Sequence, residues 1–302
     1  SAISSFLCFS IFASIKKIFD IFYYHARFIS NKQLERMWIR VFRENKYGCI
    51  LGFSDFLRLA YKFNTLIPQG CEHVADANSD RDLNNYFPQT QAHVKFTSDE
   101  EIKGKRFLEK VGLNNEQSFI CFHLRDSAYL NKVYTSTNWY YHNYRDSSLE
   151  SYIPALVSLA QQGNTIFRMG HVVKDPLLPI HERIIDYASS LRNEFTDIYL
   201  LARCKFLIST TGGIFGISTI FRRPVVFCNF IPIEYARGGN PHDMIIFKKI
   251  WSKKEKRLLS LSEIMSLGIG RFASTELYDR EGVEIIENTQ EEICDVVNEM
   301  NQ

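Results

Sequence analysis

Short apolar runs and amphipathic segments follow one another along most of the chain. Four runs are typical of strands buried on both faces of a parallel sheet, and they cover 119–122, 165–169, 205–209 and 225–228. Segments with apolar positions three and four residues apart predict helices, at 97–112, 149–162, 181–191 and 214–221. Strands that alternate with helices at this spacing predict an α/β fold with a Rossmann-like, doubly wound parallel sheet.

The remainder of the C-terminal part gives weaker signals. Residues 198–201 predict a short strand or turn, and 245–251 and 258–261 predict short extended pieces. Val283–Ile286 is the predicted last strand. Thr289 with Glu292 three residues later forms a capping box, which predicts the start of a final helix.

The first part of the chain has a different pattern. Residues 32–43 and 55–61 predict helices and 47–53 one short strand, whereas 67–95 are rich in turn-forming residues. We therefore place a domain boundary there. A smaller, mostly helical N-terminal region over 1–95 precedes a Rossmann-like domain over 96–302.

The N-terminal apolar stretch is too short to span a bilayer. It runs over residues 2–15 and is followed, not preceded, by lysines, which is the wrong order for a signal peptide. An amphipathic or core helix is one interpretation. A membrane-surface helix is the other, and it would give a peripheral membrane contact through residues 1–29. Because the chain begins at Ser1 without methionine, we expect a processed or truncated piece.

Composition excludes several functional classes. Hydrophobic residues make up 45% of the chain and charged residues 23%, as in a soluble globular protein. The net charge of +2 argues against a nucleic-acid partner. Seven cysteines without a C-x-x-C pair indicate a reducing cytoplasm and no zinc site. Asp80-Arg81-Asp82 has the form of a D-x-D metal motif, but its polar flanks favour a solvated loop, so we expect no metal.

Candidate binding residues follow three of the predicted strands. They are His123, Arg125 and Asp126 after the first, Arg168 and Gly170 at the end of the second, and Thr210, Thr211, Gly212 and Gly213 after the third. Ligands of a doubly wound sheet bind outside the carboxyl ends of its strands. Two arginines and a glycine turn at that edge suit a diphosphate. The alternatives are salt-bridged arginines and a turn whose glycines serve packing only.

The sequence is compatible with two roles for His123. It is a candidate general base, or a group that holds the loop by donating to a backbone carbonyl. Asp126 is grouped with it as a catalytic candidate, although an acid beside Arg125 is better suited to orienting that arginine.

The segment 127–145 is unusually aromatic for a surface loop. Its candidates for a lid or an acceptor platform are Trp139, Tyr141, His142, Tyr144 and Arg145. The alternative is a loop packed by its own rings. Asp146 or Ser147 is expected to cap a helix that begins near Ser148.

Several of these segments also resemble a known family. HLRDSAYL, YYHNYRDSSLESYIPAL, FRMG, IDYASS, DIYLLARCKFLIST, FRRPVVFCNFIP and IENTQEEICDVVNEM occur in this order within residues 96–300. Together they resemble an uncharacterised family of bacterial glycosyltransferases found among surface-polysaccharide genes. The H-x-R pattern also resembles the first motif of fucosyltransferases, in which the arginine holds the donor diphosphate, and here that residue is Arg125.

The resemblance implies a cytoplasmic, metal-independent enzyme with a GT-B C-terminal-type domain that binds a nucleotide sugar. The acceptor would be a glycan or a lipid-linked glycan. Residues 1–95 are shorter and more helical than a complete GT-B acceptor domain, so they predict a reduced one. The alternatives are a non-catalytic nucleotide- or glycan-binding module, a truncated transferase domain, or another transferase on the same scaffold, such as a pyruvyl transferase.

Overall fold

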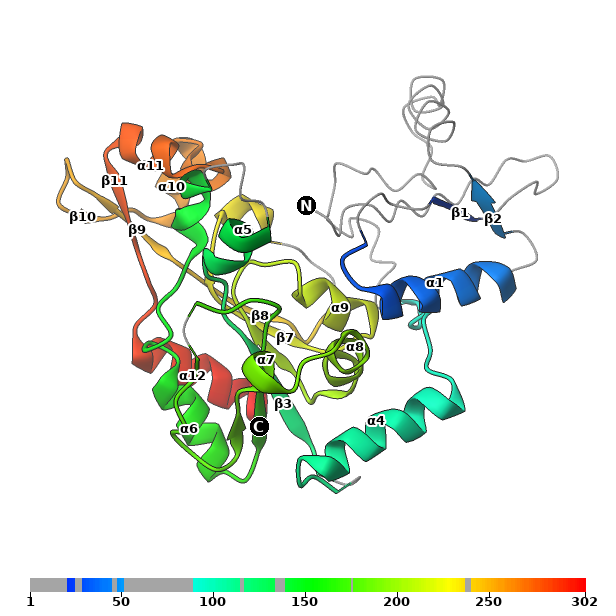
Figure 1. Ribbon diagram of the computed structural model, residues 1–302. Helices are drawn as coiled ribbons and strands as arrows, with labels where there is room; N and C mark the ends of the chain where they lie inside the picture. The colour runs from blue at the N-terminus through cyan, green and yellow to red at the C-terminus, as the bar shows by residue number, and fades with distance from the viewer. Residues whose placement is uncertain are drawn as a thin grey trace.

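The C-terminal part of the protein is built around one parallel sheet with six strands (Figure 1). The computed structural model describes residues 21–24, 29–44, 48–51, 89–114, 117–133, 139–174, 176–236 and 240–302. The strands are β3 Phe119–His123, β4 Thr165–Met169, β5 Ile184–Ile185, β6 Leu207–Ser209, β7 Val225–Phe230 and β8 Met244–Phe247. They are ordered β5-β4-β3-β6-β7-β8, and every neighbouring pair is parallel. The strand order therefore reverses between β3 and β6, as in a Rossmann fold.

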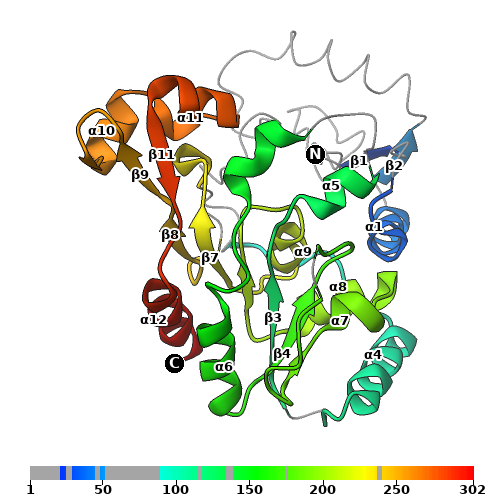
Figure 2. The same cartoon turned by 60° about the vertical axis from the view of Figure 1, so that its left-hand side comes forward.

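Helices cover both faces of this sheet, so the prediction of a doubly wound α/β fold is confirmed. α6 Ile153–Gln161 and α12 Gln290–Asn301 pack on one face through Leu156, Leu159 and Val297. α4 Ser98–Lys110 and α8 Glu194–Arg203 pack on the other. Figure 2 shows the two layers on either side of β3 and β4. Capping boxes at Thr97 and Thr289 begin α4 and α12, the second as predicted.

A small antiparallel sheet extends the C-terminal end of the fold. β9 Lys249–Ser252 pairs with β10 Arg257–Leu258 and with β11 Val283–Ile286. α10 Leu261–Ser266, α11 Thr275–Glu281 and the 3-10 helices η2 Ile233–Tyr235 and η3 Ile269–Arg271 surround it. Their side chains form a separate apolar cluster that includes Ile250, Ile264 and Tyr278. The sequence predicted the strands of this unit, but not its two α-helices.

The N-terminal region is described in part. α1 Lys32–Glu44 confirms the helix predicted at 32–43, and β1 Ile21–Tyr24 pairs in parallel with β2 Gly48–Leu51. Leu34 and Met37 of α1 pack with Ile198 of α8. The predicted helix at 55–61, the Asp80–Asp82 loop and most of residues 1–29 lie outside the described residues. Among the described helices, none has the length and apolarity needed to cross a membrane.

Three sequence-based predictions of local structure are wrong. The helix predicted at 181–191 is the short strand β5 followed by α7 Tyr187–Ser190. Residues 198–201 lie inside α8, where the Asn193 side chain accepts from the Phe195 and Thr196 N–H groups and so begins a helix. The helix expected near Ser148 begins only at Ile153, and neither Asp146 nor Ser147 is its N-cap, which is Tyr152.

Candidate functional site

The candidate site lies at the carboxyl ends of β3 and β6, where the strand order reverses. In open α/β sheets this reversal leaves a crevice between the loops that follow the two strands, because those loops run to opposite faces. The first loop carries Arg125 and Asp126, and the second carries the turn Thr210–Gly213. The Arg125 N–H donates to the Thr210 hydroxyl over 3.0 Å and ties the two loops together.

Arg125 is held by the 3-10 helix η1 Tyr140–Arg145 and by Asp146, which follows it. Its Nη1 donates to Asp146 Oδ1 at 2.5 Å and to the His142 carbonyl at 3.2 Å. Its side chain is only 10% exposed. Burial and the neighbouring Arg145 lower the pKa of Arg125, but an arginine keeps its charge at neutral pH. The site therefore holds a fixed guanidinium with one end committed to Asp146.

Arg145 contacts the glycine-bearing turn directly. Its Nη2 donates to the Thr211 carbonyl at 3.1 Å and its Nε to the Thr211 hydroxyl at 3.4 Å. The sequence placed Arg145 in a lid or acceptor platform, whereas the structure places it beside the turn. Within the described residues, the N–H groups of Gly212 and Gly213 donate no hydrogen bond. Two arginines thus contact this turn, and two of its amides have no hydrogen-bond acceptor among the described residues.

His123 lies beside the same turn at the end of β3. It is the registered neighbour of Ser209, whose hydroxyl is 3.5 Å from His123 Nδ1. Burial, together with the charges of Arg125 and Arg168, lowers the pKa of His123 to about 4. The imidazole is therefore neutral at pH 7 and has a nitrogen that can accept a proton. A Cβ added at Gly212 would lie 3.1 Å from its Cε1, so the glycine allows this close approach.

Asp126 forms no ion pair with Arg125 among the described residues, although its charge acts on the pKa of that arginine. Its Oδ1 accepts from the Ala128 N–H and its Oδ2 from the Lys174 N–H, both at 2.9 Å. The first of these bonds joins residues two apart and precedes the helix α5 Ala128–Val133. The carboxylate thus organises two loops, and Asp146 is the acid that holds Arg125.

Arg168 and Gly170 are buried at the carboxyl end of β4, the neighbour of β3 in the sheet. The Arg168 side chain is 3% exposed and its Nη1 is 3.8 Å from the carboxylate of Asp186. Its charge still contributes to the low pKa of His123. Gly170 is buried with φ 157°, and a Cβ there would lie 2.9 Å from Val173. The structure therefore gives both residues contacts within the fold, and direct binding of a diphosphate by them stays a prediction.

The aromatic residues predicted as a lid pack on one another around η1. Trp139 stacks on His142 with ring centroids 5.9 Å apart, and Tyr141 lies 4.1 Å from His142. Tyr144 packs on Tyr278 at 5.4 Å and is 7% exposed. The alternative of a segment packed by its own rings therefore describes part of this loop, and residues 134–138 lie outside the described ranges. Burial and the charges of Arg145 and Arg125 lower the pKa of His142 to about 4.

Two charged residues of the site were not singled out as binding groups by the sequence. Asp146 pairs with Arg125, and Lys248 donates from Nζ to the Asp146 carbonyl at 2.5 Å. Lys248 also lies 3.5 Å from Glu287 and is buried, which lowers its pKa. The sequence could have indicated Lys248 as a candidate, because this lysine directly follows the apolar strand β8. Among the described residues, no group of three or more His, Cys, Asp or Glu is placed to hold a metal ion.

Comparisons with known proteins give weak likenesses. No family model matches the sequence, and no curated protein matches it. Among solved structures, the glycosyl transferase family 9 protein from Veillonella parvula is similar with a TM-score of 0.40 and 10% identity, over 75% of this chain and 56% of that one. The wall teichoic acid polymerase TagF is similar with a TM-score of 0.34 and 12% identity, over 97% of this chain and 61% of that one. The chain thus spans less than two thirds of either protein, and we take its function from its own residues.

Proposed function

We propose that this protein is a nucleotide-sugar-dependent glycosyltransferase with a GT-B-type donor domain. The reaction would move a sugar from a nucleoside diphosphate to a glycan or lipid-linked acceptor in the bacterial cytoplasm, in polysaccharide biosynthesis. One observation carries the proposal. Arg125, Arg145 and the turn Thr210–Gly213 meet where the strand order reverses, and this is where doubly wound folds bind nucleotides.

The chemistry of these groups suits a leaving diphosphate. When the sugar departs, negative charge grows on the diphosphate oxygens, and fixed donors lower the energy of that state without having to reorganise. Arg125 and Arg145 supply guanidinium donors, and Gly212 and Gly213 supply backbone amides. Such a set of donors performs the neutralisation that a divalent cation performs in other transferases, which supports a metal-independent reaction.

His123 is the candidate general base. Its pKa of about 4 keeps the imidazole neutral at pH 7 but makes it a weak base. It would therefore take the proton of an acceptor hydroxyl only as that oxygen bonds to the sugar. The Asp126 carboxylate already accepts two backbone N–H groups and is less suited to proton transfer. Because one of the two catalytic candidates is engaged in this way, a second candidate function is a module that binds nucleotide or glycan without catalysis.

Binding of nucleoside diphosphates tests the proposal. Calorimetry with GDP, UDP and CDP is carried out with and without the chelator EDTA, and we expect binding of at least one nucleotide that EDTA leaves unchanged. Loss of binding in EDTA would contradict the metal-free site. Absence of binding to all three nucleotides would contradict the proposed function.

Mass spectrometry of the protein with a panel of nucleotide sugars separates the two candidate functions. The transferase requires release of nucleoside diphosphate together with a new glycosidic product or, without acceptor, free sugar. The binding module requires nucleotide complexes with no released product. Pyruvyl transfer would instead leave every nucleotide sugar intact.

A further inference from the structure

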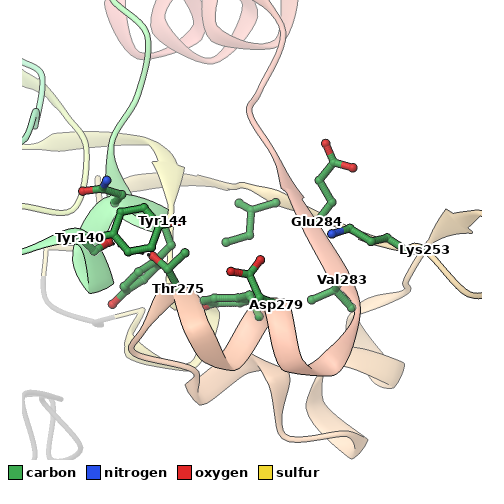
Figure 3. A pocket seen from close by; sticks show the side chains of 10 residues that line it. Tyr140, Tyr144, Lys253, Thr275, Asp279, Val283 and Glu284 are labelled. Carbon is green, nitrogen blue, oxygen red and sulfur yellow. Dashed lines mark hydrogen bonds between the residues drawn. The ribbon is translucent and has the colours of Figure 1, made fainter.

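A pocket lies on the side of η1 that faces the small C-terminal sheet (Figure 3). Its volume is about 250 Å³, and its walls come from η1, α11, β11 and the turn after β9. Drug-sized ligands occupy pockets of roughly 300–1,000 Å³. This pocket is therefore suited to one ring with its substituents, and it is too small for a nucleotide.

The base of the pocket is aromatic and its rim is polar. Tyr144 and Tyr278 form the base and are 7% and 3% exposed, whereas Tyr140 at the edge is 54% exposed. In Figure 3, Tyr140 and Tyr144 close one side, Asp279 rises from α11, and Lys253 closes the opposite side. A flat aromatic surface beside polar groups binds the apolar face of a ring whose edge carries hydroxyls.

Three polar side chains at this rim keep their hydrogen-bonding capacity. Within the described part of the chain, no ion pair or side-chain hydrogen bond involves Asn143, Lys253 or Asp279. The Lys253 backbone is nevertheless held in place, because its N–H donates to the Gly282 carbonyl at 3.1 Å. The Asp279 carboxylate can accept hydrogen bonds from hydroxyl groups, and the Lys253 ammonium can donate to them. The Asn143 amide can do both.

We propose that this pocket is a saccharide-binding subsite that takes one pyranose unit of a glycan. A pyranose offers an apolar C–H face to the tyrosine rings and neighbouring hydroxyls to Asp279, Asn143 and Lys253. An anionic ligand is disfavoured by Asp279, and an aliphatic ligand would leave the polar rim without hydrogen bonds.

The helix η1 connects this subsite with the candidate nucleotide site. A 3-10 helix has three residues per turn, so residues i and i+3 lie on one face. Tyr140 and Asn143 are three apart and line the pocket, whereas Arg145 lies on another face and contacts Thr211. Thr275 of α11 donates to the Tyr140 and Tyr141 carbonyls and fixes the helix on the pocket side. A saccharide that holds η1 in place therefore favours the Arg145–Thr211 contact, and this coupling rests on the proposed function.

Saturation-transfer NMR and titration with the methyl pyranosides of glucose, galactose, N-acetylglucosamine and rhamnose test the subsite without nucleotide. We expect at least one glycoside to bind the wild-type protein, and Asp279→Ala and Asn143→Ala each to weaken binding about tenfold or more. Asp279 is exposed near the C-terminal end of α11, where removing an acid does not harm the helix. The matched control is Glu281→Ala, which removes an exposed acid outside the pocket from the same helix.

The outcomes separate the subsite from the proposed function. No binding of any of the four glycosides, or equal losses in Asp279→Ala and Glu281→Ala, overturns the subsite. For the coupling arm, the affinity for UDP is measured with and without the bound glycoside, and we expect it to rise at least about fivefold. Glycoside binding without any nucleotide binding supports the subsite and contradicts the proposed function. Nucleotide binding without glycoside binding supports the proposed function and contradicts the subsite.

Discussion

Arg125 Nη1 lies 2.5 Å from Asp146 Oδ1, although 21 residues separate the two in the chain. The pair joins the loop after β3 to the segment after η1, and Lys248 holds that segment from the end of β8. Burial raises the pKa of Asp146, and its attraction to Arg125 opposes this effect. The guanidinium is thus oriented by one acid and has further donors for a second anion.

Replacing Arg125 by alanine should weaken binding of the nucleoside diphosphate by about 1.5–3 kcal/mol, the range of a hydrogen bond to a charged group. Arg125→Lys should restore little of this, because an ammonium cannot reproduce a two-pronged contact. Calorimetry with the tightest-binding nucleotide measures both. Arg106→Ala, which removes an exposed arginine of α4, is the matched control.

Loss of Arg125 also leaves Asp146 without its ion-pair partner. The double variant Arg125→Ala, Asp146→Ala should regain stability while the affinity stays low. If the double variant regained affinity together with stability, Arg125 would be a structural partner of Asp146 and not a ligand-binding residue.

Arg168→Met should reduce stability far more than affinity. The substitution leaves Asp186 without its buried partner, and removing one member of a buried pair costs about 3 kcal/mol or more. Chemical denaturation gives the free energy of unfolding, and calorimetry on the folded protein gives the affinity. A stable variant with lost nucleotide binding would return Arg168 to the set of diphosphate ligands predicted from the sequence.

Much of the central sheet can be predicted from the sequence, because its strands are apolar throughout. β3 and β4 each bury four or more consecutive residues, and such runs are distinctive. α8 was missed for a related reason. Residues 195–202 are all buried, and a short apolar run such as 198–201 is as typical of a buried strand as of a buried helix.

The candidate site was predictable only where it depends on strand order. His123 and the turn after β6 share an edge because parallel strands end on the same side, and this follows from the pattern of elements. The Arg125–Asp146 pair depends on where η1 lies against the sheet, which local pattern does not determine. Likewise, the burial of Arg168 depends on Asp186, which comes from the segment mistaken for one long helix.

The depressed pKa of His123 should appear in the pH dependence of stability. The folded pKa is about 4, below the ordinary value of 6.5, so between these values the unfolded chain binds a proton that the folded protein does not. The contribution of His123 is therefore fully present above pH 6.5 and is lost as the pH falls toward 4. The loss is on the order of 3 kcal/mol.

Comparison of the wild-type protein with His123→Asn isolates this contribution, because the other titrating groups are common to both. The free energy of unfolding of the wild type minus that of the variant should be constant above pH 7 and decrease below it. A difference that did not change between pH 7 and pH 4.5 would show that His123 titrates normally in the folded protein.

Gly212→Ala should lower nucleotide affinity while leaving most of the stability. The turn follows the buried strand β6 directly, and its Thr211 is contacted by Arg145, so an added methyl group would occupy space beside the proposed diphosphate. Its Cβ would lie 3.1 Å from the His123 ring, and a small movement of that side chain relieves the contact.

Gly104→Ala is the contrasting variant, because its Cβ would lie 2.1 Å from the ring of Tyr199, between α4 and α8. That variant should lose stability and keep its affinity in the folded fraction. The melting temperature and the nucleotide affinity by calorimetry are measured for both variants. They distinguish a glycine that leaves room for a ligand from one that serves packing. If Gly212→Ala behaved like Gly104→Ala, destabilised but binding normally, the turn would serve packing only. The diphosphate site at β3 and β6 would then lose one of the two elements that define it.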